Sequence, residues 1–376
     1  MIEVVQLSTK TELRRFIDLQ FEIYKGDPCF VPPLIGDLLG SLMGKNNRLF
    51  EIGPHAFFIA YRDGKPVARV LTGCDNELNN RKGVRQGYVS LLDFYEDYDA
   101  FQAIMNKVIE YQKSIDIDTL IGPNSYTFND FGMGCLIEDF DVPPMLYCVY
   151  NKPYYADFYE RYGFKQHLDH YSFYFEPQGM AQKYKRYDLI SKQAMERYNF
   201  HVVKVDLNND MHLRAIHRVF CEALPATNEF DIPAPTLDDV YNEMREVKPF
   251  YDDDYTFLAF AGDRPIGFFF AIPDYNQVLK RMNGHLLPLG VFKFLYYRKK
   301  IDAVRVIISY VVEEYKNRAV PGAIFCEFYK SVLKNGIQAV EGSTIAQGNY
   351  PSLNGAERAG GRRYRTTRQY QLKINQ

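Results

Sequence analysis

The sequence predicts an α+β protein built from two tandem copies of one domain, each a mixed, largely antiparallel sheet flanked by helices. The stretch 57–68 is echoed by 257–267, in which Pro66 and Pro265 lie 199 positions apart, and the Asn-x-Pro triplet at Asn151 recurs at Asn349, 198 positions later. Because chance matches need not share a register, two matches at nearly one offset indicate a duplicated domain. The order of strand and helix patterns also repeats between the halves.

In the first half, apolar residues alternate where we expect strands and recur at helical spacing where we expect helices. Thr9 suits the N-cap of the first helix, Asp63-Gly64 is a hairpin turn signal, and Gly163 suits the end of a helix. The expected elements are strands at 3–7, 87–94, 119–121 and 170–176, a hairpin at 57–71, and helices at 13–23, 98–115 and 156–162.

The second half repeats this order after a polar, helix-prone run. We expect strands at 200–205, 304–312, 339–343 and 363–374, a hairpin at 255–272, and helices at 211–221 and 321–334. The predicted domains are therefore residues 1–180 and 200–376, joined by a linker helix at 181–199.

Two inserts interrupt the repeat, at 122–147 and at 276–300. Inserts of this length in a compact domain are usually functional or mobile. The end of the second insert, 292–300, is aromatic and then basic. This pattern is typical of an ordinary surface insert, and it also suits a lid or a contact for a phosphate-bearing ligand.

The composition is that of an ordinary globular protein, with 47% hydrophobic and 24% charged residues. A net charge of -2 gives no basis for a nucleic-acid partner. The six cysteines form no C-x-x-C pair and no histidine cluster is visible, so we expect reduced thiols, no metal site and a cytoplasmic location. No apolar stretch approaches the ~20 residues of a membrane span, and the sequence leaves monomer and homodimer open.

A basic turn between the strand at 304–312 and the helix at 321–334 is the best candidate for an anion site. Lys316 and Arg318 lie in the turn, and Pro321 suits the first helical position, where a missing N–H costs little. The helix N-terminus adds a partial positive charge, so the turn suits a diphosphate or triphosphate group. The alternative is a strand-to-helix turn that binds nothing.

This segment resembles the phosphate loop of the GNAT superfamily of N-acetyltransferases, which reads Gln/Arg-x-x-Gly-x-Gly/Ala after the fourth strand. Here residues 316–321 read Lys-Asn-Arg-Ala-Val-Pro, so both glycines are replaced. The family's second signature, an Asn followed by a helix ending in Phe-Tyr-x-x-x-Gly-Phe, is present from Asn151 to Phe164. Most of the chain resembles a tandem pair of such domains.

The resemblance implies acetyl-CoA or another acyl-CoA as cofactor, held by the second domain. The implied contacts are Val311, Val312, Lys316, Asn317, Arg318, Ala319, Val320, Gly322 and Asn349. The first half has residues 91–100 at the corresponding place, where several carboxylates would repel a pyrophosphate.

Three residues are candidates for the chemistry that the resemblance implies. Tyr159 matches the family tyrosine that protonates the leaving thiolate, and a phenol with a pKa near ~10 suits that task. Glu313 and Glu314 lie where a carboxylate could take a proton from an ammonium substrate. The alternatives are a core tyrosine and two solvated carboxylates.

The expected function is an acyl-CoA-dependent N-acyltransferase that moves an acetyl or longer acyl group to an amine of a small molecule, amino acid or peptide. The aromatic fraction of 15% fits aromatic-rich cores or a tunnel for an acyl chain. The lost glycines leave two alternatives: a non-catalytic ligand-sensing or interaction protein on a duplicated scaffold, and a transferase using another acyl donor.

Overall fold

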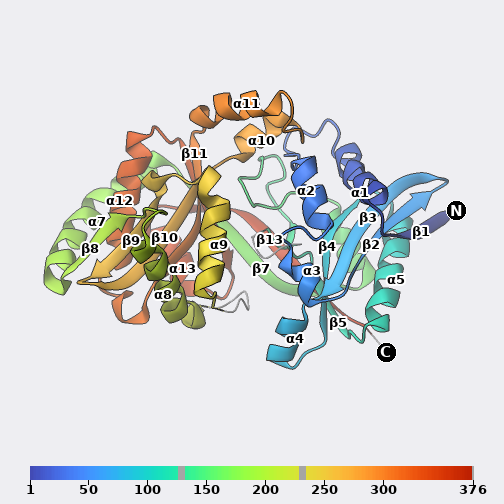
Figure 1. The fold of residues 1–376 in the computed structure, drawn as a ribbon, viewed down its shortest axis with the longest axis horizontal. Coiled ribbons are helices and arrows are strands. Elements are labelled where there is room, and N and C mark those ends of the chain that lie inside the picture. Colours follow the sequence, from blue (N-terminus) through green and yellow to red (C-terminus); the bar gives the residue numbers. More distant parts are fainter. Residues whose placement is uncertain (126–131, 228–233, 375–376) are drawn as a thin grey trace. The chain divides into compact units, whose positions relative to one another are not determined.

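The computed structural model describes residues 1–125, 132–227 and 234–374, and it confirms the predicted α+β class (Figure 1). The chain forms two compact units. Unit 1 contains Met1–His170, Asn276–Tyr297 and Arg365–Gln376, and unit 2 contains Tyr171–Tyr275 and Arg298–Tyr364. Part of the first predicted insert, residues 126–131, lies outside the described residues.

Unit 1 contains a sheet in the order β1-β2-β3-β4-β5-β13. Its strands are β1 (Ile2–Leu7), β2 (His55–Arg62), β3 (Lys65–Cys74), β4 (Gln86–Phe94), β5 (Thr119–Gly122) and the short β6 (Cys135–Leu136). Its helices are α1 (Lys10–Ile23), α2 (Ile35–Leu42), α3 (Arg48–Ile52), α4 (Asn76–Lys82), α5 (Tyr98–Ser114), α6 (Tyr155–Tyr162), α10 (Asn276–Met282) and α11 (Gly290–Tyr297). Two long strands, β7 (Lys165–Phe175) and β13 (Arg362–Lys373), have residues in both units.

Unit 2 contains a sheet in the order β7-β12-β11-β10-β9-β8. Its other strands are β8 (Phe200–Lys204), β9 (Thr256–Ala261), β10 (Arg264–Pro273), β11 (Ala303–Val311) and β12 (Ala339–Ala346). Its helices are α7 (Pro177–Tyr198), α8 (Asp210–Thr227), α9 (Leu237–Val247), α12 (Val320–Lys334) and α13 (Tyr350–Arg358). Short 3-10 turns are η1 (Lys248–Phe250), η2 (Asp253–Tyr255), η3 (Arg298–Lys300) and η4 (Glu313–Tyr315).

Local signals act as the sequence predicts. Asp63 and Gly64 both have positive φ, 51° and 80°, which gives the β2–β3 hairpin a primed turn that matches strand twist. Thr9 caps α1 in a capping box with Glu12. Gly163 ends α6 with φ 113°, a conformation that favours glycine.

The same plan occurs in both units: an antiparallel hairpin, then two parallel strands joined by a helix. In unit 1, β4 pairs with β5 only over Gln86–Tyr88, and in unit 2, β11 pairs with β12 only over Ala303–Val306. Both β4 and β11 continue beyond these paired residues, so in each unit the two parallel strands diverge. Strands that part in this way leave backbone groups available at the sheet's middle.

The predicted domain boundaries need one correction, because the compact units are not contiguous in sequence. Tyr370–Lys373 of β13 pairs with β5, which puts the end of the chain in unit 1. The first part of the second insert, Asn276–Tyr297, also belongs to unit 1. The predicted linker helix is α7, which lies in unit 2 and packs against α12.

Apolar side chains fill both faces of the unit 1 sheet. Phe58 packs with α5 and α6, and the neighbouring Phe57 and Ile59 pack with α1 and α2. Since successive strand residues point to opposite faces, these are two separate cores. Unit 2 has one large core beneath α7 and α12 that includes Phe257, Phe269 and Phe328.

Candidate functional site

The turn between β11 and α12 in unit 2 forms a compact 3-10 turn in place of a glycine-rich loop. Tyr315 N donates to Val312 O at 2.9 Å, and Arg318 N donates to Tyr315 O at 3.0 Å. Val311 and Val312 are buried at the end of β11. Ala319 precedes α12 in a left-handed conformation, with φ 62°. The backbone therefore takes the conformation that glycine would adopt easily, at a strain cost of about 1 kcal/mol or more.

Four backbone amides remain available at this turn. Within the described residues, no acceptor takes the N–H of Asn317, Ala319, Val320 or Gly322. Pro321 carries no N–H, and its place at the start of α12 fits the prediction. Free amides at a helix N-terminus form a natural site for a phosphate group.

The two cations predicted to bind phosphate are held by the two carboxylates predicted as bases. Lys316 Nζ lies 2.5 Å from Glu313 Oε2, and Arg318 Nη2 lies 3.4 Å from Glu314 Oε1. Glu314 also pairs with Arg264 at 2.9 Å. The Glu313 side chain is 72% exposed and the Glu314 side chain 49%. Exposed pairs contribute only about 0–1 kcal/mol, so a pyrophosphate could displace the carboxylates at small cost.

Small residues let α7 cross the start of α12. A Cβ added to Gly322 would lie 3.4 Å from both Ser191 Oγ and Tyr187 Cδ1 of α7. The Ser191 hydroxyl is buried without a hydrogen-bond partner. These are ordinary van der Waals distances, so Gly322 lies against α7, whereas the sequence suggested only a cofactor contact.

The structure gives the two matching asparagines different tasks. Asn349 caps α13, since its Oδ1 accepts a hydrogen bond from Ser352 N at 3.2 Å. Asn151 is buried in unit 1, where Oδ1 accepts from Leu136 N at 2.6 Å and Nδ2 donates to Leu136 O at 3.1 Å. The Asn151 amide is thus satisfied by backbone groups of unit 1, and the Asn349 carbonyl oxygen is used to cap α13.

Tyr159 lies in the core of unit 1. Its residue is fully buried, its ring stacks on Tyr370 at 5.2 Å, and its hydroxyl has no hydrogen-bond partner. Burial raises the pKa of Tyr159 well above its usual value. A proton donor must reach the leaving group, and a raised pKa weakens it as an acid. This geometry is that of a core side chain, so we do not assign Tyr159 the role of general acid.

Replacing Tyr159 with phenylalanine is expected to leave the free energy of unfolding unchanged within about 1 kcal/mol, because the removed hydroxyl makes no hydrogen bond. Tyr155→Phe is the matched control on the same helix. The Tyr155 hydroxyl accepts from Phe94 N at 3.0 Å, so its loss should cost about 1–3 kcal/mol. Urea unfolding measures both, and equal losses would show that the Tyr159 hydroxyl has a partner.

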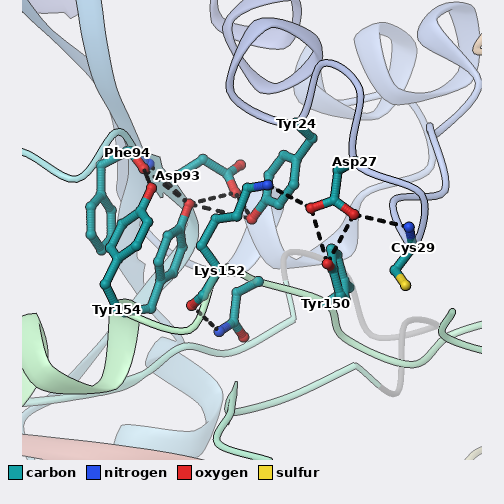
Figure 2. Close-up of polar contacts among 10 residues, drawn as sticks. Tyr24, Asp27, Cys29, Asp93, Phe94, Tyr150, Lys152 and Tyr154 are labelled. Carbon is teal, nitrogen blue, oxygen red and sulfur yellow. Dashed lines mark hydrogen bonds and ion pairs between the residues drawn. The ribbon is translucent and has the colours of Figure 1, made fainter. Parts of the chain in front are cut away.

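A buried polar network that the sequence did not predict lies at the end of β4 (Figure 2). Asp93 Oδ2 accepts hydrogen bonds from Arg69 Nε at 2.8 Å and Arg69 Nη2 at 2.6 Å. The Tyr24 hydroxyl donates to Asp93 Oδ1 at 3.1 Å. The Tyr154 hydroxyl donates to Phe94 O at 2.7 Å. This network ties α1 and α6 to the strand where unit 1 would need a phosphate loop.

The N-terminus of the next helix, α5, is already capped by a carboxylate. Asp97 caps α5, because its Oδ1 accepts from Ala100 N at 3.1 Å, and its Oδ2 lies 2.6 Å from Arg62 Nε. An anion at this position would meet Asp97 directly. The first half therefore offers no equivalent of the β11–α12 turn, as its sequence suggests.

A second group in the same view surrounds Asp27 (Figure 2). Lys152 Nζ lies 2.5 Å from Asp27 Oδ2, and the Tyr150 hydroxyl donates to Asp27 at 3.0 Å. Burial raises the pKa of Asp27, but hydrogen bonds from Lys152, Cys29 N and Tyr150 outweigh it and lower the pKa. The carboxylate therefore stays charged and fixes the loop after α1 to the segment before α6.

A hollow in unit 2 is lined with lysines, and a carboxylate holds two of them. The lining residues are Val202, Lys204, Phe257, Glu327, Lys330, Ser331 and Lys334. Lys204 and Lys334 both pair with Asp254. Lys330 pairs with Glu327 at 2.7 Å. Because the shared Asp254 is buried, whereas Glu313 and Glu314 are exposed and easily displaced, this hollow is a weaker anion site than the β11–α12 turn.

We expect Asp254 to make the free energy of unfolding decrease at acidic pH. Burial raises its pKa, but hydrogen bonds from Lys204, Asn335 and Lys334 lower the pKa from 3.8 to about 2. The stabilisation is therefore present above pH 3.8 and is lost as the pH falls toward 2, by about 2 kcal/mol. Unfolding measured across this range should show the loss, and Asp254→Asn should remove it. An unchanged acid profile in that variant would contradict the assignment.

Three general findings bear on the site. No helix of the described chain is both long and apolar enough to cross a membrane. Among the described residues, no group of three or more His, Cys, Asp or Glu side chains could hold a metal ion. All six cysteines are free thiols.

No protein-family model matches the chain, but two relatives match nearly its whole length. Protein YghO of Escherichia coli K12 is 26% identical over 382 residues, covering 97% of this chain and 94% of the relative. Bacterial ceramide synthase of Caulobacter vibrioides is 21% identical over 387 residues, covering 99% and 98%.

Among solved structures, the tandem GNAT protein from the clavulanic acid biosynthesis pathway matches with a TM-score of 0.59 at 13% identity. The match covers 100% of this chain and 99% of that protein. The resemblance inferred from the sequence is thus confirmed at the level of fold: the chain has the tandem GNAT architecture.

Proposed function

We propose, on the premise of a tandem GNAT fold, that the protein is an acyl-CoA-dependent N-acyltransferase whose β11–α12 turn holds the cofactor's pyrophosphate. The observation that carries this proposal is the set of unpaired amides at Asn317, Ala319, Val320 and Gly322. They point from a helix N-terminus, beside two cations whose present partners are exposed and easily displaced.

The residues of the turn bind and orient in this proposal. Amide N–H groups of the turn would hold phosphate oxygens, and Lys316 and Arg318 would exchange Glu313 and Glu314 for phosphate. Acyl-CoA, when bound, would supply a thioester whose carbonyl carbon bonds to the amine nitrogen while the C–S bond breaks, so that CoA leaves as its thiol. Glu313 would then be free of its cation, which is the state in which a carboxylate could accept the ammonium proton, whereas Glu314 keeps its pair with Arg264.

The acceptor is proposed to be a long-chain amine. One relative is named a bacterial ceramide synthase, and a ceramide is an amide of a fatty acid with a long-chain amino alcohol. The match covers 99% of this chain and 98% of that relative. A cytoplasmic location is part of the proposal, and the six free thiols agree with a reducing compartment.

The test is thermal unfolding with CoA, acetyl-CoA and a long-chain acyl-CoA, followed by transfer assays with short and long amines. A ligand at ~100 times its Kd adds about 2.7 kcal/mol of apparent stability. We expect stabilisation by the acyl-CoA and amide formation with the long amine. No stabilisation by any of the three would overturn the cofactor proposal.

A non-catalytic binding role is the second candidate, because two observations favour it. Ala319 takes a left-handed conformation without glycine, and the tyrosine that matches the family acid is buried. Binding of acyl-CoA without amide formation from any amine would select this role. Amide formation from any one of them would exclude it.

A further inference from the structure

The second insert exposes an unusual amount of apolar surface. Six large hydrophobic side chains, the insert patch, are exposed by 42–74%: Leu286, Leu287, Leu289, Phe292, Leu295 and Tyr296. The other exposed large hydrophobics of the described chain are scattered through residues 1–211, 333 and 350. Exposed apolar side chains concentrated in one short segment indicate an interaction surface, whereas scattered ones need no explanation.

Three of these exposed side chains lie on helix α11. Leu295 and Tyr296 lie three and four residues after Phe292, so the three side chains form one stripe along the helix. Gly290 on the other side of the helix is buried. The stripe is therefore exposed by the fold itself, and the helix does not use it to pack on unit 1.

The first part of the insert, residues 276–284, is held by contacts with the rest of unit 1. Val278 and Met282 of α10 are buried, and Asn276 Nδ2 donates to Pro144 O at 2.8 Å. Ile35 N donates to Gly284 O at 3.0 Å. Gly284 has φ 77°, and a Cβ there would lie 2.7 Å from the Phe21 ring. These contacts hold residues 276–284 of the insert against the rest of unit 1.

The charged residues of the insert are all basic. Between Asp274 and Asp302 the sequence has no acidic residue and six basic ones, in a protein whose net charge is -2. The basic residues are Lys280, Arg281, Lys293, Arg298, Lys299 and Lys300. Lys293 lies on α11 beside the apolar stripe. Apolar and aromatic side chains among lysines and arginines are the composition of segments that lie in the membrane interface.

We infer that the insert patch docks on the surface of a bilayer that contains anionic lipids. The apolar side chains would enter the boundary between headgroups and acyl chains, and the cations would meet lipid phosphates. A second copy of the chain fits less well, because a symmetric contact sets each basic insert against its equal. Docking goes beyond the proposed function, and it would bring the protein to where long-chain amines reside.

Flotation with lipid vesicles tests this inference without any activity. The full chain should float with vesicles of phosphatidylcholine containing about one third phosphatidylglycerol, and more weakly with phosphatidylcholine alone. Raising the salt concentration should weaken the binding, since screening removes the electrostatic part. Failure of the full chain to float with anionic vesicles at low salt would overturn the inference.

Variants locate the contact. Leu287→Glu/Phe292→Glu/Leu295→Glu should weaken vesicle binding by about a hundredfold or more, and Lys293→Glu by about fivefold. Leu189→Glu/Met211→Glu changes residues that are 61% and 72% exposed elsewhere, and should bind like the unmodified chain. Circular dichroism checks that each variant is folded. Equal binding by all variants, or a dimer that only the triple variant abolishes, would contradict membrane docking.

Discussion

Replacing Arg69 with methionine is expected to destabilise the protein by about 3–5 kcal/mol, because it leaves Asp93 charged and buried. The Arg69 side chain has no exposed surface and Asp93 is 8% exposed at its side chain. Arg69 also donates from Nη1 to Phe16 O at 2.9 Å, so the substitution also frees a carbonyl on α1. Denaturant unfolding followed by far-UV circular dichroism measures the loss.

Two control variants distinguish the loss of this buried ion pair from the loss of an ordinary charged side chain. The double variant Arg69→Met/Asp93→Leu should be more stable than Arg69→Met alone, since no unpaired charge remains. Arg14→Met breaks an exposed pair, Arg14–Asp18, in which both side chains are 44% exposed, and should cost less than about 1 kcal/mol. If Arg69→Met costs no more than Arg14→Met, the network does not hold α1 to β4.

Lys316→Glu/Arg318→Glu should weaken acyl-CoA binding by at least about a hundredfold. Each cation lost from a phosphate contact removes about 1.5–3 kcal/mol, and each new carboxylate repels the ligand. Isothermal titration or the thermal shift measures the change. Because both side chains are at least partly exposed, the fold should be unaffected.

Neutralising the carboxylates beside these cations should have the opposite effect on acyl-CoA binding. Glu313→Gln/Glu314→Gln frees Lys316 and Arg318 from their present partners and should tighten acyl-CoA binding several-fold. Lys330→Glu, on the same helix but away from its N-terminus, should leave binding unchanged. Weakening by Lys330→Glu to the same degree would place the ligand elsewhere on α12.

Local sequence patterns were sufficient for most of the fold. The Asp63-Gly64 turn, the Thr9 cap and Gly163 each depend on neighbours in sequence, and each acts as predicted. The short helices between the main elements, such as α3 and α4, were not predicted, since five to seven residues hold too little periodicity to detect. The exchange of segments between units could not be predicted, because it depends on pairing between residues more than 200 positions apart.

The site shows the same limit. The sequence located the basic turn, but whether a side chain faces a ligand or its own core depends on packing, as Tyr159 shows. The Arg69–Asp93 pair was missed, although a signal existed: a charged residue in the centre of the apolar run 67–71. Arg305 in β11 gives the same signal and lies equally buried beside Glu341. A lone charge in an apolar strand predicts a buried partner.

The place of β13 in unit 1 has a consequence for synthesis in the cell. Residues 365–376 leave the ribosome long after residues 1–170, yet both segments belong to unit 1. Throughout that interval β5 lacks its neighbour, and its open edge can pair with any passing strand. Unit 1 therefore completes its sheet only after unit 2 has been translated, so a prematurely terminated chain carries an open strand edge that chaperones and proteases can recognise.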